Sequence, residues 1–172
     1  MKVRLNWVAK NTKATYRVEA ADLESAMKFL SGRDEDEWGV TDYDLRSNWE
    51  HDAQGNVSAV TVDARYTITM PSWSAYRSQP QKCKDEWDTM WRALRKHEDG
   101  HRELFENFVS KLVSKLEALA TATVRDVEEI VKQVISENES EQKAYDTRTD
   151  HGKSQGVELT ITPECRSKRK NE

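Results

Sequence analysis

The sequence predicts an α+β fold, in which a β-sheet with one short helix is followed by a long pair of helices. Strand-like alternation of apolar and polar residues dominates residues 1–70, and apolar residues recur at helical spacing over residues 80–144. Strands and helices do not alternate as they would in a doubly wound sheet. We therefore expect an antiparallel or mixed N-terminal sheet, then an antiparallel helical pair. A single domain over residues 1–162 and a polar, basic tail over residues 163–172 complete the predicted organisation.

The N-terminal elements are short. Two strands are expected within residues 1–21, separated by a turn at Asn11. A helix follows, with Asp22 as its N-cap and Gly32 at its end. The acidic segment after it has the composition of turns, with room for one strand over about residues 38–45.

The clearest strand covers residues 57–70, where every second residue from Val60 to Met70 is apolar. Pro71 is expected to end it. Because this strand precedes the long helices, an exposed edge there is a hypothetical place for an extended substrate to bind by β-addition.

Two helices are predicted next, over about residues 80–120 and 123–144. Thr123 and Asp126 resemble a capping box at the start of the second helix. A last strand is expected over residues 157–161, where apolar and polar residues alternate again.

The composition limits the classes of binding partner that are expected. The net charge is −4 and the charged residues, 34% of the chain, are interspersed in sign, so nothing favours nucleic acid or an anionic membrane surface. No segment is long and apolar enough to span a membrane, and the oligomeric state is left open. Whether Cys83 and Cys165 pair is also undecided by the sequence.

The most informative motif is His97-Glu98-Asp99-Gly100-His101, inside the first long helix. Residues four apart lie one helical turn from each other, so both imidazoles can reach one zinc ion. The glutamate between them is placed to take a proton from a water at the metal. With four histidines in the chain, the motif is expected by chance on the order of once in a hundred such sequences.

The motif also falls on the apolar face of its helix, where two imidazoles and a carboxylate are costly to bury unless they are paired or bound to a metal. The competing interpretation is a pair of core histidines, with Glu98 ion-paired to Arg102 or Arg148. Gly100, which costs about 1 kcal/mol relative to Ala inside a helix, suggests that something approaches the helix closely.

A catalytic zinc needs a third protein ligand. His151, in the segment just after the second helix, is the predicted ligand, and Glu141 on that helix is an equally well spaced alternative. Asp146, Thr149 and Asp150 are expected to orient His151 as neighbours of the ligand.

Tyr145 belongs to the same segment. Its hydroxyl is a candidate hydrogen-bond donor to the oxyanion of a tetrahedral intermediate. Packing of the ring at a helix end is the simpler explanation of the residue.

Over residues 57–159 the chain resembles a bacterial family of predicted secreted zinc-dependent proteases, formerly a domain of unknown function. The resemblance rests on the strand ending Met70-Pro71-Ser72-Trp73, on the histidine motif, and on residues 145–156, which begin Tyr-Asp-Thr-Arg-Thr-Asp-His-Gly. It implies a zincin-like metallopeptidase and favours His151 over Glu141 as the third ligand.

The function predicted is therefore hydrolysis of a peptide or protein substrate by a zinc-activated water, with Glu98 as general base. One alternative is a non-catalytic interaction module whose metal site is structural or vestigial, and another is a zinc amidase that acts on cell-wall peptides. The family implies a periplasmic or secreted protein. Because no signal peptide is visible, the protein is expected in the cytoplasm if the numbering starts at the native N-terminus.

Overall fold

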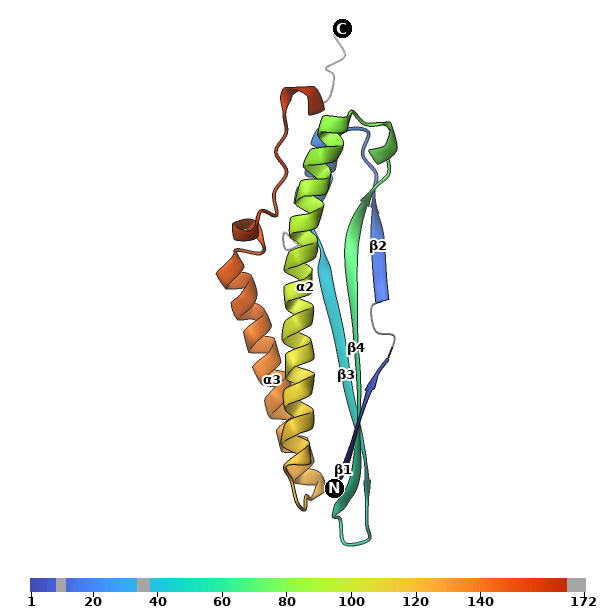
Figure 1. Ribbon diagram of the computed structural model, residues 1–172, viewed down its shortest axis with the longest axis vertical. Coiled ribbons are helices and arrows are strands. Elements are labelled where there is room, and N and C mark those ends of the chain that lie inside the picture. Colours follow the sequence, from blue (N-terminus) through green and yellow to red (C-terminus); the bar gives the residue numbers. More distant parts are fainter. Residues whose placement is uncertain (9–11, 34–37, 167–172) are drawn as a thin grey trace. The chain divides into compact units, whose positions relative to one another are not determined.

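The computed structural model describes residues 1–8, 12–33 and 38–166. In chain order its strands and α-helices are β1 (Lys2–Trp7), β2 (Thr12–Val18), α1 (Leu23–Ser31), β3 (Val40–His51), β4 (Val57–Trp73), α2 (Gln81–Glu117) and α3 (Val124–Thr149) (Figure 1). The α+β class is confirmed. The predicted turn at Asn11 and the end of the basic tail lie outside the described residues.

The chain forms two compact units. Unit 1 contains residues 1–12, 41–67 and 100–145, and unit 2 contains residues 13–40, 68–99 and 146–172. The long elements β4, α2 and α3 each contribute residues to both units.

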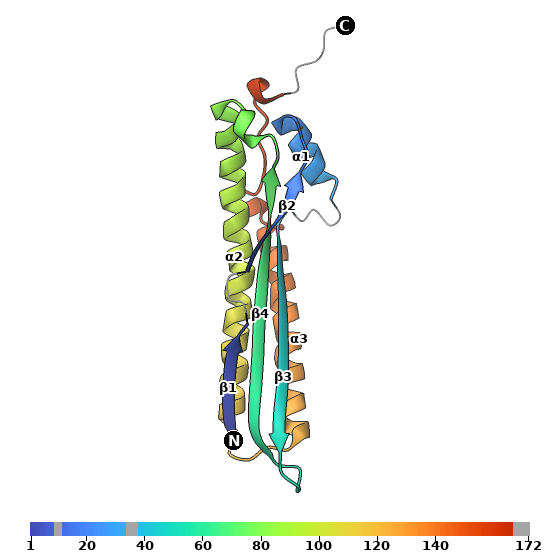
Figure 2. The ribbon, with the colours of Figure 1, turned by 90° about the vertical axis from the view of Figure 1, so that its right-hand side faces the viewer.

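In unit 1, β1 and β3 lie on opposite sides of β4 (Figure 2). β1 is parallel to β4, with a register that runs from Lys2 opposite Ala59 to Trp7 opposite Ala64. β3 and β4 form a hairpin and are antiparallel. Of the two expected arrangements, antiparallel or mixed, the sheet is therefore mixed, because β1 is parallel to β4.

The core of unit 1 lies between this sheet and the two long helices. Its fully buried members come from β4, α2 and α3, and they are Val60, Val62, Leu112, Leu116 and Val127. Burial of side chains of this size contributes about 1.5–3 kcal/mol each. The salt bridge between Lys111 and Glu137, 2.6 Å long, joins the outer faces of the antiparallel helices.

In unit 2, α1 begins as predicted, because Asp22 Oδ1 accepts a hydrogen bond from the amide of Ser25 at 2.8 Å. The disulfide Cys83–Cys165 ties the C-terminal segment to the start of α2. This answers the question that the sequence leaves open about the two cysteines.

Two predicted strand boundaries and one predicted strand are wrong. β4 continues through Pro71 to Trp73. The proline removes only one backbone N–H from the strand, and its carbonyl oxygen accepts a hydrogen bond from the indole of Trp91. β3 is longer than expected, since it runs from Val40 to His51, and it pairs with β4. Residues 157–161 form no strand, and the alternation there reflects burial of Val157 and Leu159.

No helix among the described residues is long and apolar enough to cross a membrane.

Candidate metal site

The histidine motif lies in the middle of α2, as predicted. His97 and Glu98 are almost completely buried, with 4% and 3% of their surfaces exposed, and His101 is half-buried. The helix is continuous through all five residues of the motif, so the two imidazoles are one turn apart.

A glutamine of α3 fixes the tautomer of His101. Nδ1 of His101 lies 2.6 Å from Oε1 of Gln142. The amide nitrogen of Gln142 donates to the carbonyl oxygen of His101 at 3.1 Å and to Oδ1 of Asn138 at 3.2 Å. Because both of these partners are acceptors, the amide oxygen must face the ring, and Nδ1 carries the hydrogen. Nε2 is then the ring atom with the lone pair that a metal requires.

His97 has a similar environment within unit 2. Its Nδ1 lies 3.0 Å from Oε1 of Gln155, and its Nε2 lies 3.3 Å from Oδ1 of Asp146. Gly152 packs against the ring, since a Cβ at that position would lie 3.1 Å from Cγ of His97. Gly152 also has a φ of +84°, so both its conformation and its contact exclude a side chain.

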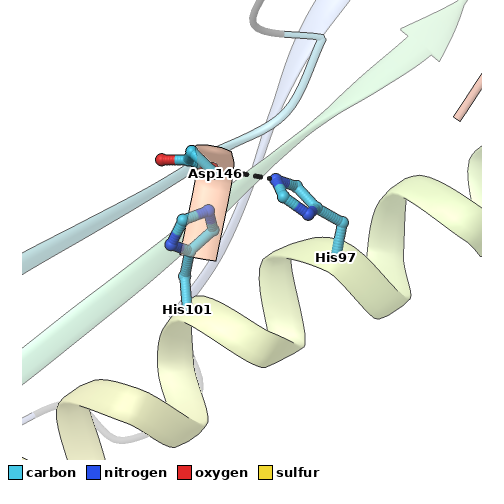
Figure 3. Close-up of side chains that lie close together, drawn as sticks. All are labelled: His97, His101 and Asp146. Atoms are coloured by element: carbon cyan, nitrogen blue, oxygen red, sulfur yellow. Dashed lines mark ion pairs between the residues drawn. The ribbon is translucent and has the colours of Figure 1, made fainter. Parts of the chain in front are cut away.

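His97, His101 and Asp146 together form a group of three possible metal ligands (Figure 3). One ligand atom of each lies within 4.8 Å of those of the other two. Two atoms bound to one zinc at 2.0–2.1 Å in tetrahedral geometry are about 3.3 Å apart. The Nε2–Oδ1 distance between His97 and Asp146 is 3.3 Å, which matches that requirement.

Tyr145 lies beside this group. Its ring meets that of His101 edge to face, with 4.8 Å between the ring centres. A Cβ added at Gly100 would overlap the hydroxyl of Tyr145 and lie 2.5 Å from its Cζ. The close approach that Gly100 suggests is therefore made by the phenol of Tyr145.

Glu98 also packs against the segment between α1 and β3, within unit 2. A Cβ at Gly39 would lie only 2.8 Å from Oε1 of Glu98, so the carboxylate packs against the backbone of Gly39. Burial, and to a smaller extent the charge of Glu98, raise the pKa of Tyr16 to about 12, against the opposing effect of Arg33. The neutral phenol of Tyr16 donates a hydrogen bond to the carbonyl of Trp38 at 2.6 Å.

The predicted third ligand is not part of the group. His151 is exposed and has a left-handed backbone, with a φ of 50°. Glu141 is exposed as well. Among the described residues, the third member is Asp146, which was expected only to orient His151.

Gln142 and Gln155 are not among the site residues predicted from the sequence. A signal for one of them exists, because Asn138, Gln142 and Asp146 are spaced four residues apart and so form a polar stripe on one face of a helix. No comparable spacing marks Gln155.

The family profile described as "Bacterial protein of unknown function (DUF922)" matches residues 13–152, which include every member of the site except Gln155. No curated protein and no solved structure matches the chain.

Proposed function

The chain belongs to the DUF922 family of bacterial proteins of unknown function, and we propose that it is a zinc-dependent peptidase. The observation that carries the proposal is the group His97, His101 and Asp146, together with the glutamine oxygen that faces Nδ1 of each histidine. Two imidazoles and one carboxylate form a donor set that suits zinc and leaves a coordination position open.

The surroundings of the donors fit a metal. Metal-binding histidines usually donate their second ring N–H to a neighbouring acceptor, which fixes the ring and its tautomer. Gln142 and Gln155 would do this for His101 and His97. The third donor in this proposal is Asp146, in place of His151.

Zinc bound there would polarise the scissile carbonyl and make a water molecule more acidic. Glu98 is the proposed base that accepts the proton and passes it to the leaving amine. The hydroxyl of Tyr145, held against Gly100, would donate a hydrogen bond to the developing oxyanion.

The disulfide Cys83–Cys165 supports a place outside the cytoplasm, because such bonds persist mainly in oxidising compartments. We include a periplasmic or secreted location in the proposal. Expression in an oxidising and in a reducing compartment, followed by titration of free thiols, tests separately whether the disulfide forms only under oxidising conditions.

The decisive experiment is metal analysis of the purified protein, combined with cleavage of a mixed peptide library. We expect bound zinc in the wild type and its loss in His97→Ala, His101→Ala and Asp146→Ala. Glu141→Ala and His151→Ala are the matched controls and should retain zinc. Loss of zinc in His151→Ala but not in Asp146→Ala would reject the ligand set.

The catalytic role is tested with Glu98→Gln. This variant should bind zinc normally and lose about 10²–10⁴-fold in the rate of hydrolysis. A variant with full activity contradicts the role of Glu98. Cell-wall peptides belong in the same substrate panel, so that an amidase is distinguished from a peptidase.

A non-catalytic module is the second candidate, and one observation favours it. A distance of 3.3 Å between Nε2 of His97 and Oδ1 of Asp146 also falls within the range of a direct contact between the two side chains that needs no metal. In that case the purified protein would contain no stoichiometric metal, and adding zinc would not raise its melting temperature.

A further inference from the structure

Unit 1 contains a pocket of about 200 Å³ between β3 and the two long helices. Most of its walls are apolar or aromatic, and they come from Tyr43, Leu45, Phe105, Phe108, Val134 and Ile135. Asn138 closes one side, and Asp44 and Glu139 complete the lining.

The pocket has an aromatic wall of defined geometry. The rings of Tyr43 and Phe105 are stacked, with 5.1 Å between their centres and 22° between their planes. Tyr43 and Ile135 remain 38% and 39% exposed, so both are accessible from solvent. An apolar cavity of about 150 Å³ accepts a benzene molecule. The pocket is therefore large enough for one aromatic side chain.

Two connections join this pocket to the candidate metal site. Phe105 follows His101 by one turn of α2. Asn138 lines the pocket and also accepts the hydrogen bond from Gln142, whose oxygen faces the ring of His101. A residue bound in the pocket would thus lie within unit 1 next to one of the three donors.

A second hollow extends the pocket along α3. It has a volume of about 460 Å³, shares Ile135 and Glu139 with the first, and continues past Ser47 and Trp49 of β3. Within the described residues β3 pairs with β4 and with no other strand. An extended chain can therefore run beside β3 while it occupies the groove.

We propose that this groove binds the peptide substrate in an extended conformation and that the 200 Å³ pocket selects a phenylalanine or tyrosine side chain. The inference deepens the proposed peptidase function and rests on it for the identity of the ligand. β4, considered from the sequence as a substrate-binding edge, is paired on both sides and cannot take this part.

The experiment measures binding apart from hydrolysis. The probe is a fluorescent peptide of alanine, serine and lysine with one central phenylalanine, and its partner has alanine at that position. Fluorescence anisotropy is recorded with chelator-treated protein, which prevents cleavage. Ile135→Trp narrows the pocket. Leu5→Trp, at a position on β1 that is 37% exposed and outside the groove, is the matched control.

We expect the phenylalanine peptide to bind the wild type and Leu5→Trp about tenfold or more tightly than the alanine peptide. In Ile135→Trp the preference should fall below about twofold, while circular dichroism shows the same fold. Equal binding of the two peptides by the wild type overturns the proposal, and so does equal behaviour of the two tryptophan variants.

The outcome is separable from that of the proposed function. A phenylalanine preference without zinc or cleavage would retain the pocket and reject the peptidase. Cleavage without preference for an aromatic residue would retain the peptidase and reject the pocket.

Discussion

Replacement of Gly100 by alanine tests the packing of the site most directly. In an ordinary helix interior this change is stabilising by about 1 kcal/mol, because alanine is the better helix former. Here the new methyl group would overlap the hydroxyl of Tyr145 and lie 2.5 Å from Cζ and 3.1 Å from Cε1. The ring is packed edge to face on His101, so moving it away would break that contact.

The expected sign follows from these two effects. Forcing an extra methyl group into a packed contact costs about 1–3 kcal/mol, which exceeds or offsets the gain in helix propensity. We therefore expect Gly100→Ala to lower the free energy of unfolding by up to about 2 kcal/mol. In a Tyr145→Ala background the obstacle is gone, and the same change should raise it by up to about 1 kcal/mol.

Urea unfolding of the four proteins of this double-mutant cycle measures the coupling, which should equal the cost of the contact, about 1–3 kcal/mol. Ser114→Ala, at an exposed position of the same helix, reports the effect of helix propensity alone. If Gly100→Ala changes the stability equally in the wild type and in the Tyr145→Ala background, Tyr145 does not occupy the space over Gly100, and its place beside His101 is refuted.

Three further predictions concern the surroundings of the site. Gln142→Leu removes the acceptor for Nδ1 of His101 and should weaken zinc binding about 10–100-fold, measured by competition with a chelator. Gln133→Leu, at an exposed position of the same helix, is the control and should leave the affinity for zinc unchanged. Burial, with the charge of Glu98, raises the pKa of Tyr16 to about 12. The stability that the neutral phenol contributes is therefore fully present below pH 10 and is lost as the pH rises through 12. Tyr16→Phe should abolish this part of the alkaline destabilisation in thermal melts, and an unchanged pH profile in the variant would contradict the prediction. Replacing Cys83 and Cys165 by serine removes a cross-link between residues 82 positions apart. The change should lower the free energy of unfolding by about 2–4 kcal/mol relative to the oxidised wild type, measured by urea unfolding. If the variant is also less stable than the reduced wild type, the loss comes from damage to packing and not from the missing cross-link.

Local patterns predicted those elements whose signals lie within a few residues. The cap at Asp22, the course of α2 and the alternation in β4 depend on neighbours in the chain, and the structure contains all three. The parallel pairing of β1 with β4 joins residues about 57 positions apart. No periodicity within a strand encodes its partner or its direction, so the sequence could not show which strand of the sheet is parallel.

The metal site could be predicted only in part, because local patterns determine the positions of only some of its residues. His97 and His101 are positioned by the geometry of one helix, which the sequence makes evident. The third donor depends on where α3 ends, and it ends at Thr149 instead of the predicted residue 144. Asp146 is therefore a helical residue beside His97, while His151 falls in the turn that follows and is exposed.

The extension of α3 also explains the composition of the segment from Tyr145 to Gly156. The last helical turn carries Tyr145 and Asp146, and the following turn must reverse tightly enough for Gln155 to reach His97. Gly152 permits that reversal because glycine readily adopts a positive φ. Its lack of a side chain also allows the backbone to contact the imidazole of His97 directly. The segment that resembles a ligand-bearing loop thus acts mainly through its helical start and its end, and His151 occupies the exposed turn between them.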